Sequence, residues 1–333
     1  MVTIKDIARE CGVSPATVSK ALNGYGDINP VTAEGIRAKA QEMNYHPNLA
    51  ARQLKTNISR NIGVVFEDET NSGLAHEHFS RILNSAKDEA EHLGYDITFI
   101  SEVFGGSFVE HCRNRKCDGV LITTADFAQP SIVELVDSEI PTVSIDYAFE
   151  NQTCIMSDNM EGEYRLTRYL IEQGHRKIAF IHGEKTAVTI KRLRGFYQAC
   201  QEAGIEVPDA YVIEGKYHET SNSAIATRSL MQMRNRPTAI LYPDDYAYIG
   251  GSTELRNMGI RVPEDVSVAG YDGIGLSQVL SPKLTTWCQD TDKIGRCAAR
   301  KLVELIESKG KAKAEQVLVS GRLQKGESVS RVS

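Results

Sequence analysis

The chain has 333 residues and a formal net charge of −6, with 41% hydrophobic and 25% charged residues. This length suits two or three domains, and the composition is that of a water-soluble globular protein with an ample core. A run of 18 apolar residues and a signal-peptide core are both absent, which excludes a membrane protein and predicts a cytoplasmic location.

The charge is divided unevenly along the sequence. Residues 1–60 contain eight Lys and Arg and five Asp and Glu, giving +3. The remainder contains 30 basic and 39 acidic residues, giving −9. The positive charge is thus concentrated at the N-terminus, which would suit contact with phosphates there, while the acidic body would oppose non-specific binding.

Two short helices are predicted at the N-terminus. Thr3, with Asp6 three residues later, has the pattern of a capping box before apolar residues at helical spacing. Gly12 interrupts the helix, since glycine adopts a left-handed exit conformation at little cost. Ser14 then supplies an N-cap, and Pro15 a first helical position where a missing N–H is tolerated. Two helices joined in this way are typical of a helix-turn-helix, whose second helix lies in the DNA major groove.

Three motifs make this segment more specific than a helical hairpin that serves only as scaffold. Ile-x-Asp-Ile-Ala, Gly-Val-Ser-x-Ala-Thr-Val-Ser and Ala-Leu-Asn-Gly follow one another within the first 24 residues. The run resembles the headpiece of the lactose-repressor (LacI/GalR) family of bacterial transcription regulators, and the likeness extends over essentially the whole chain. The resemblance implies a repressor that binds palindromic, double-stranded operator DNA as a homodimer, under the control of a small-molecule effector.

The exposed start of the second predicted helix indicates which residues contact DNA. We expect Pro15, Ala16 and Lys20 to face the major groove, with Thr17 and Ser19 nearer the phosphates. The full set of expected DNA-binding residues is Thr3, Ser14, Pro15, Ala16, Thr17, Ser19, Lys20, Asn23, Asn48, Ala51, Leu54 and Lys55.

A third helix is predicted over residues 30–43, with Asn29 as its cap and Pro30 at its first position. We expect its apolar side to pack behind the first two helices. The residues of that side are Val31, Ile36, Ala40 and Met43.

Residues 48–55 form a short helical pattern between two punctuated segments. Eight residues are too few to hold a helix alone in water, so one interpretation is a linker that is helical only part of the time. The resemblance implies instead a hinge helix that folds on operator DNA. In that interpretation Leu54 is a wedge between base steps in the minor groove, and Ala51 lets two such helices approach.

From residue 60 onward, apolar strand patterns alternate with amphipathic helix patterns. The predicted strands are 61–66, 95–100, 119–123, 142–145, 177–182, 211–214, 238–242, 266–271 and 316–320. The predicted helices are 74–93, 131–138, 159–173, 189–203, 221–234, 246–258 and 290–307. This alternation predicts an α/β fold with doubly wound parallel sheets, and the number of units predicts two lobes, as in periplasmic binding proteins.

The predicted organisation therefore has three parts. They are an all-α headpiece at 1–46, a hinge and linker at 47–58, and a two-lobed effector-binding and dimerisation core at 59–333. Lobe 1 is expected at about 59–158 plus 290–320, and lobe 2 at about 159–289, with crossings near 157–161 and 287–291.

Ligands of such folds bind beyond the carboxyl ends of the strands, so the residues that follow the predicted strands are candidates. These, together with one helix arginine, are Glu67, Asp68, Asp146, Tyr147, Arg192, Tyr217, Asp244 and Asp272. Carboxylates, a guanidinium fork and aromatic faces suit a polyhydroxylated ligand such as a sugar. The resemblance implies effector contacts for Asp146, Arg192, Asp244 and Asp272, and stacking for Tyr217.

Two alternatives remain for this acidic set. The family more often has asparagine at the position of Asp244, so the extra charge leaves room for an amino sugar or another cation. Each single carboxylate is also compatible with a helix cap or a solvated loop.

The sequence offers no support for catalysis, a cofactor or a metal. Gly273 and Gly275 lack the third glycine of a dinucleotide fingerprint, and a GxxxxGK[ST] phosphate loop is absent. His76 and His78 have poor metal-binding spacing, and seven scattered cysteines without a CxxC pair predict free thiols. A sugar kinase or dehydrogenase would need a nucleotide loop, and a periplasmic sugar receptor would need a signal peptide and no headpiece.

Overall fold

The computed structural model describes residues 2–22, 26–45, 58–67, 73–104 and 106–332. The chain divides into two compact units, Met1–Ser59 and Arg60–Ser333. The hinge prediction for 48–55 lies outside the described residues, as do the individual predictions for Asn23 and Asp68. Among the described helices, none has the length and apolarity needed to cross a membrane.

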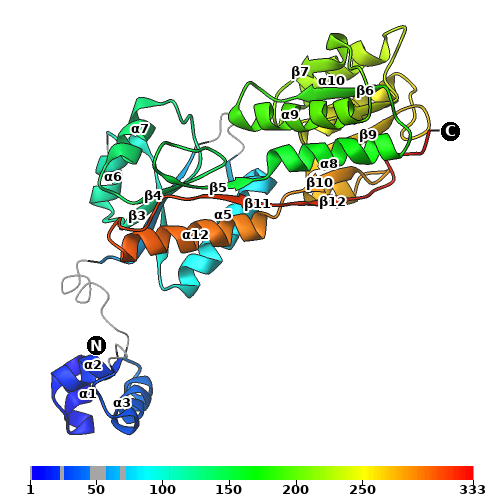
Figure 1. The fold of residues 1–333 in the computed structure, drawn as a ribbon. Helices are drawn as coiled ribbons and strands as arrows, with labels where there is room; N and C mark the ends of the chain where they lie inside the picture. The colour runs from blue at the N-terminus through cyan, green and yellow to red at the C-terminus, as the bar shows by residue number, and fades with distance from the viewer. Residues whose placement is uncertain (1, 23–25, 46–57, 68–72, 105, 333) are drawn as a thin grey trace. The chain divides into compact units, whose positions relative to one another are not determined.

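In its described residues, the first unit has three helices: α1 (Ile4–Cys11), α2 (Pro15–Leu22) and α3 (Pro30–Glu42) (Figure 1). The capping box is present, because Thr3 Oγ1 accepts from the Asp6 N–H while Asp6 accepts from the Thr3 N–H at 2.9 Å. Gly12 ends α1 with φ of 63°, the left-handed conformation predicted for it. Ile7, Val18 and Ile36, one from each helix, are fully buried together, so the three helices share one small core.

The packing face of α3 differs from the prediction at its first residue. Val31 is 79% exposed, whereas Ala33, Ile36 and Ala40 are buried. These three fall at positions i, i+3 and i+7 and therefore share one helix face, which Val31 does not.

The second unit contains two six-stranded sheets, each of which defines a lobe. Lobe 1 has the strand order β11-β5-β4-β3-β1-β2, and lobe 2 has the order β12-β10-β9-β8-β6-β7. The strands of lobe 1 are β1 (Asn61–Phe66), β2 (Asp96–Ile100), β3 (Gly119–Thr124), β4 (Thr142–Ile145), β5 (Thr153–Ser157) and β11 (Gln316–Val319). The strands of lobe 2 are β6 (Ile178–His182), β7 (Val212–Glu214), β8 (Ala239–Leu241), β9 (Ser267–Asp272), β10 (Thr285–Cys288) and β12 (Arg322–Gln324).

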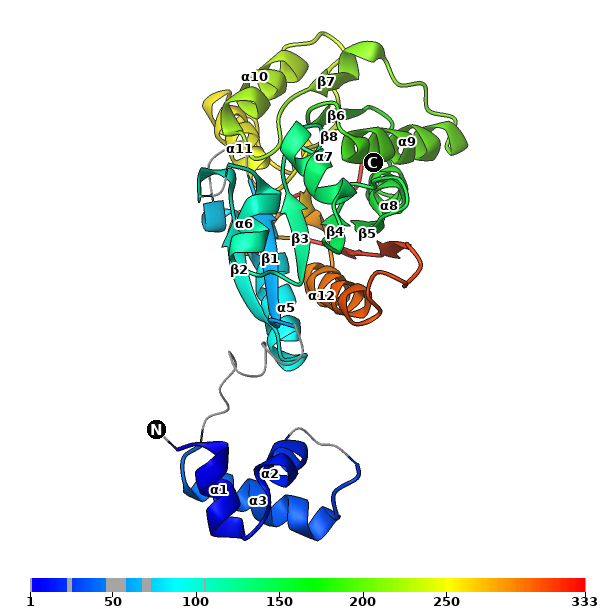
Figure 2. The same ribbon diagram turned by 90° about the vertical axis from the view of Figure 1, so that its left-hand side faces the viewer.

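Helices cover both faces of each sheet. In lobe 1, α5 and α12 enclose one hydrophobic core, and α6 and α7 enclose another (Figure 1). In lobe 2, α8 and α9 lie on one side and α10 and α11 on the other (Figure 2). Their bounds are α5 (Glu77–His92), α6 (Phe108–Asn114), α7 (Pro130–Asp137), α8 (Asn159–Glu172), α9 (Ala187–Glu202), α10 (Thr220–Met231), α11 (Ala247–Asn257) and α12 (Thr291–Glu307). Short 3-10 turns occur at Gly73–Ala75, Glu102–Phe104, Asp209–Tyr211 and Gly275–Gln278.

The doubly wound parallel fold is confirmed, with one antiparallel addition. All recorded strand pairs are parallel except β10 with β12. The chain passes between the lobes after β5, after β10 and again between β11 and β12. The third passage was not predicted, nor were β5, β10, β12 and α6.

Candidate functional site

The first candidate surface is the exposed side of α2. Val18 and Ala21 are buried in the headpiece core, which leaves Pro15, Ala16 and Lys20 exposed on the other side of the helix. Because their side chains face solvent from a helix held by its neighbours, these three are free of any packing role. Such a side can enter a groove of DNA.

The polar residues of this surface have local partners. Ser14 Oγ accepts from the Thr17 N–H at 3.1 Å, so Ser14 caps α2 as predicted. Lys20 forms an ion pair with Asp27, and the hydrogen bond from Lys20 lowers the pKa of Asp27. To contact a base, Lys20 must therefore break its ion pair with Asp27 and bind an acceptor on the DNA instead. Thr3 is exposed and Ser19 is half-buried.

The second candidate is a cavity of about 500 Å³ in the second unit, which we call the cleft. Residues of both lobes line it, at the carboxyl ends of the strands where ligands of such folds bind. The lining includes Glu67, His76, His78, Phe79, Thr123, Thr124, Ala125, Asp126, Phe127, Ala128, Ile145, Asp146, Tyr147, Glu184, Lys185, Thr186, Ala187, Val188, Arg192, Tyr217, His218, Asp272 and Gln289. Six of the predicted residues are among them: Glu67, Asp146, Tyr147, Arg192, Tyr217 and Asp272.

Three of the lining residues hold left-handed backbone conformations although none is glycine. Asp146 has φ of 58°, His218 of 54° and Asp272 of 96°. Such conformations cost free energy and are retained where the surrounding structure imposes them, often at binding sites. The two carboxylates are fixed further, since Asp146 Oδ1 accepts from the Ser157 N–H at 2.9 Å and Asp272 Oδ1 from Gln289 Nε2 at 2.6 Å.

Arg192, on α9, is the buried cation of the cleft. It is only 4% exposed, and its guanidinium donates to Asn159 Oδ1 at 2.8 Å and to the Pro243 carbonyl at 2.7 Å. Its remaining side faces Asp272 Oδ1 at 3.8 Å and lies over the Tyr271 ring at 3.5 Å. The Arg192 guanidinium is therefore held rigidly, with N–H groups left for a ligand.

The two cleft carboxylates differ in their proton affinity. Burial raises the pKa of Asp146, against the opposing effect of the Ser157 N–H and of His78. For Asp272, burial also acts to raise the pKa, but His78 and Arg192 outweigh it, so the pKa of Asp272 is lowered. Asp272 is therefore the firmer anion of the two, and Asp146 the more readily protonated acceptor.

Aromatic rings line the side of the cleft that lobe 1 contributes. Phe127 and Tyr147 stack with centroids 4.4 Å apart and planes 6° apart, and Phe149 packs edge-on against Tyr147 at 4.7 Å. Across the cleft, Tyr217 donates to or accepts from Thr189 at 2.8 Å. Flat apolar faces thus stand next to charged groups, as in sites for ring-shaped polar ligands.

Three histidines of the cleft were not predicted as site residues. The rings of His76 and His218 meet with centroids 3.7 Å apart, and His78 is fully buried against the charges of Asp272 and Asp146. Burial lowers the pKa of His78. Within the described part of the chain, no three His, Cys, Asp or Glu side chains are arranged to hold a metal ion. We therefore regard the histidines as ligand-facing or lobe-bridging groups.

Asp244 has a different position from the one expected of it. It is fully buried outside the cleft lining, and its carboxylate accepts from the Ala247 N–H at 2.7 Å and from the His218 N–H at 2.8 Å. Asp244 thus holds the start of α11 and the backbone of His218, which lines the cleft. Neighbouring Asp245 accepts from Thr286 and the Ile274 N–H, and burial raises its pKa.

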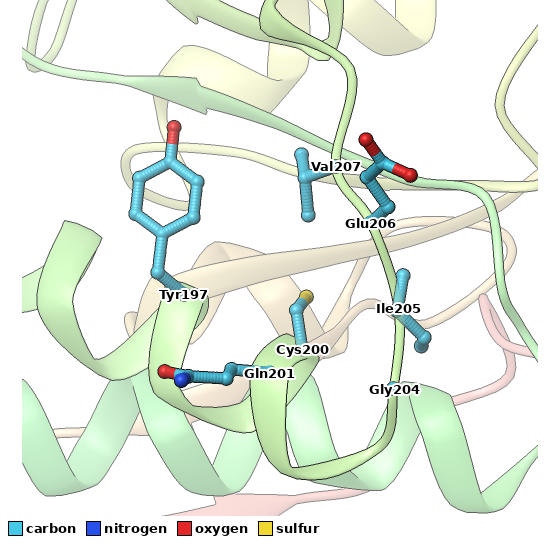
Figure 3. A pocket seen from close by; sticks show the side chains of 7 residues that line it. All are labelled: Tyr197, Cys200, Gln201, Gly204, Ile205, Glu206 and Val207. Carbon is cyan, nitrogen blue, oxygen red and sulfur yellow. The ribbon is translucent and has the colours of Figure 1, made fainter.

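A second hollow, of about 430 Å³, lies at the end of α9 (Figure 3). Its lining consists of Tyr197, Cys200, Gln201, Gly204, Ile205, Glu206 and Val207. Glu206 is the one ionisable carboxylate in this lining and faces no arginine there. The cleft, with its buried arginine and opposed carboxylates, is the better candidate for a specific ligand site.

Comparison with known families finds one match in each of the two units. Residues 3–48 match the model described as "Bacterial regulatory proteins, lacI family", and residues 167–329 match "Periplasmic binding protein-like domain". The chain is 34% identical over 320 residues to the HTH-type transcriptional repressor PurR of Vibrio atlanticus, covering 93% of both chains. It is 33% identical over 325 residues to PurR of Pasteurella multocida, covering 94% of this chain and 95% of the relative.

Solved structures show the same likeness over the full length. The lac repressor dimer bound to operator and the anti-inducer ONPF superposes with a TM-score of 0.76 at 26% identity, covering 99% of each chain. The complex of the transcriptional regulator CelR with cellobiose superposes with a TM-score of 0.72 at 26% identity, covering 98% of this chain and all of the other.

Proposed function

The chain belongs to the LacI family of bacterial regulatory proteins and is a DNA-binding transcriptional repressor with an effector-binding domain, and we propose that a small carbohydrate-type molecule in the cleft controls its operator affinity. Membership of this family also means that the protein is not an enzyme. We place it in the cytoplasm, where operator DNA is found, and propose that it binds a palindromic operator as a homodimer, which matches two-fold symmetry in the DNA.

The observation that supports a carbohydrate is the pairing of buried Arg192 with Asp272 in a lining that also contains Asp146 and aromatic rings. Vicinal hydroxyls donate to carboxylates and accept from a guanidinium, while the apolar face of a sugar packs on an aromatic ring. The volume of about 500 Å³ is that of a small-molecule site. The CelR neighbour is described as a complex with cellobiose, which is consistent with a sugar ligand in this fold.

A neutral sugar is favoured over an amino sugar or another cation. Asp244, which made the cleft seem unusually acidic, uses its carboxylate on backbone N–H groups instead of lining the cavity. Lys185 adds a positive charge to the lining, which also contains Asp126 and Glu184, and burial raises the pKa of Asp146. Asp244 therefore adds no carboxylate to the wall of the cleft, which removes the reason for expecting a cationic ligand.

A planar nitrogen heterocycle, such as a nucleobase, is the second candidate effector. The specific observation is the number of flat rings around the cavity, which include Phe79, Phe127, Tyr147, Tyr217 and His218. Such rings stack on heterocycles as well as on sugars. The polar edge of a bound heterocycle would meet Asp272 and Gln289, which offer acceptors and donors.

The mechanism follows from the position of the cleft between two lobes. An effector that binds one arrangement of the lobes more tightly shifts the protein toward it, and the shift is a coupling free energy between cleft and DNA. We propose that residues 48–55 transmit this shift, with Leu54 as the minor-groove wedge and Asn48, Ala51 and Lys55 beside it.

A thermal-shift screen of the full-length protein tests the effector class. The panel contains neutral mono- and disaccharides, amino sugars, sugar phosphates and nucleobases. A true ligand at ~100 times its Kd adds roughly 2.7 kcal/mol to the free energy of unfolding, and it should also change operator affinity measured by fluorescence anisotropy. If nucleobases are active and sugars are not, the carbohydrate proposal is wrong.

Two arginine variants test the location of the site. Arg192→Ala should abolish the response to the active compound while operator binding in its absence stays near wild type. Arg194, exposed on the same helix, provides the matched control, and Arg194→Ala should respond like wild type. Unchanged effector affinity in Arg192→Ala would show that the effector binds elsewhere.

A further inference from the structure

Two cysteines are brought together at the end of α6, remote from the cleft lining. The Cys117 N–H donates to the Cys112 carbonyl at 2.9 Å, and the Lys116 N–H donates to the Arg113 carbonyl at 3.0 Å. Lys116 has φ of 52°, the left-handed conformation that ends a helix in a Schellman motif. In that motif the side chains at the two ends of the longer hydrogen bond meet, and here they are Cys112 and Cys117.

The two cysteines lie beside each other but differ in environment. Cys112 is fully buried in a hydrophobic cluster of lobe 1, and Cys117 packs against that cluster. Cys117 is partly exposed and also accepts from Asn61 Nδ2 at 3.6 Å. Interaction with the Cys112 side chain lowers the pKa of Cys117, despite its partial burial, and interaction with Cys117 raises the pKa of Cys112.

These environments suit the two roles of a redox pair. A reactive cysteine is accessible and thiolate-prone, and its resolving partner stands beside it as a thiol. We propose that Cys117 and Cys112 form a peroxide-oxidisable dithiol that closes into an intramolecular disulfide.

The chemistry balances with one peroxide. The Cys117 thiolate attacks a peroxide oxygen, so that an S–O bond forms, the O–O bond breaks, and hydroxide leaves with a proton as water. The Cys112 sulfur then attacks the Cys117 sulfenic acid, forming the S–S bond, and the departing oxygen takes the Cys112 proton as a second water. Both sulfurs are oxidised and the peroxide is reduced. A dithiol such as dithiothreitol reverses the reaction by two successive thiol–disulfide exchanges, in which the dithiol is oxidised and both cysteines become thiols again.

The loop that carries Cys117 is hydrogen-bonded to Arg60 and Asn61, the first residues of the second unit. Asn61 Nδ2 donates to the Arg115 carbonyl at 3.0 Å as well as to Cys117, and Asp118 Oδ2 accepts from the Arg60 N–H at 2.6 Å. The Asp118 N–H in turn donates to the Asn61 carbonyl at 2.8 Å. Oxidation would therefore alter the support of β1 where the chain leaves the headpiece linker.

Peptide mapping of the full-length protein tests the proposal. The reduced protein is exposed to a small molar excess of hydrogen peroxide, alkylated and digested with trypsin without reduction. Trypsin cleaves after Arg113, Arg115 and Lys116, so the two cysteines fall on separate peptides unless a disulfide joins them. We expect the joined pair, with fragment spectra that assign the link to Cys117, and its loss after dithiothreitol.

Single variants separate the two roles. In Cys112→Ser, Cys117 should stop at the sulfenic acid and be captured by dimedone. In Cys117→Ser, Cys112 should stay unmodified at the same peroxide dose. Cys200→Ser, which alters another buried thiol, should form the link as wild type does. Absence of the link in wild type, a link between two chains on a non-reducing gel, or equal oxidation of Cys112 in Cys117→Ser would each overturn the proposal.

Discussion

At the scale of single residues, Asp244 shows how one carboxylate can serve a site without lining it. Both of its oxygens accept backbone N–H bonds, from Ala247 and from His218, and His218 lines the cleft. Replacement by asparagine turns one acceptor into a donor that faces an N–H. Asp244→Asn is therefore expected to lower the free energy of unfolding by ~1–3 kcal/mol and to weaken any effector, charged or neutral, by loosening His218.

Chemical denaturation and calorimetric titration of the Asp244→Asn protein check this expectation. Asp290→Asn is the control, because Asp290 also caps a helix, by accepting from the Lys293 N–H at 3.1 Å, but lies outside the cleft lining. It should lose stability without losing effector affinity. If Asp244→Asn keeps full stability and weakens only cationic ligands, then Asp244 contacts the effector directly.

Glu163, on α8, makes the stability of lobe 2 depend on pH. Burial raises its pKa from 4.5 to about 8, although the charge of Arg192 opposes the rise. Between these values the folded protein holds a proton that the unfolded chain releases, so this contribution to stability is lost as the pH rises toward 8. Each unit of difference between the folded and unfolded pKa of Glu163 is worth ~1.4 kcal/mol, so the loss of stability amounts to a few kcal/mol.

Glu163→Gln should remove this loss, because the amide stays neutral. Urea unfolding at pH 5, 7 and 9 should show wild type losing stability relative to Glu163→Gln as the pH rises. Glu172→Gln, an exposed change at the end of the same helix, should run parallel to wild type. Parallel curves for Glu163→Gln would show that Glu163 is ionised in the folded protein at neutral pH.

At the scale of elements, α2 combines a fixed frame with one exchangeable contact. Lys20 pairs with Asp27 in the headpiece, and we predict that it exchanges this partner for guanine acceptors. Lys20→Ala should relax base preference at one half-site position by ~1–3 kcal/mol. Selection from a randomised operator library measures this, with Lys39→Ala as the control because Lys39 makes a similar ion pair with Glu42 on α3. An equal loss on all sequences would assign Lys20 to the phosphates.

The elements that were predicted from sequence are those with local signals. Helices such as α1 and α3 have capping residues that mark where they begin, and strands such as β6 are continuous runs of buried, mostly apolar residues. The elements that were missed lack them, since α6 has seven residues, β12 has three, and β10 reads Thr-Thr-Trp-Cys. Their structure depends on neighbours that are distant in sequence.

The residues of the candidate site that were predicted are those that follow strands which were themselves predicted. Reading the residues after predicted strands identified Asp146 and Asp272. Gln289 was missed because it follows the unpredicted strand β10, and Phe127 because the residues after β3 were not considered. The histidines had no local signal, because His76 and His218 meet only when the two lobes come together.

At the scale of the whole second unit, the lobes are joined by contacts between α5 and the loop after β9. Glu77 Oε1 accepts from the Gly275 N–H at 2.7 Å, and Arg81 donates to the Gly273 carbonyl at 3.3 Å. Glu77 and Arg81 also pair with each other at 2.6 Å. One lobe supplies the helix and the other the loop, so these contacts favour the arrangement in which the cleft has both of its walls.

Glu77→Ala should therefore shift the lobes away from the arrangement that encloses the effector. A hydrogen bond to a charged acceptor is worth ~1.5–3 kcal/mol, and partial exposure of Glu77 brings this to the lower end, so effector affinity should fall roughly tenfold. Calorimetric titration measures the fall. Glu77→Gln, which keeps an acceptor for the Gly275 N–H, should lose less. Glu91→Ala, which breaks the exposed pair with Lys87 on the same helix, should bind as wild type. Equal affinities in Glu77→Ala and Glu91→Ala would mean that this contact does not stabilise the effector-bound arrangement.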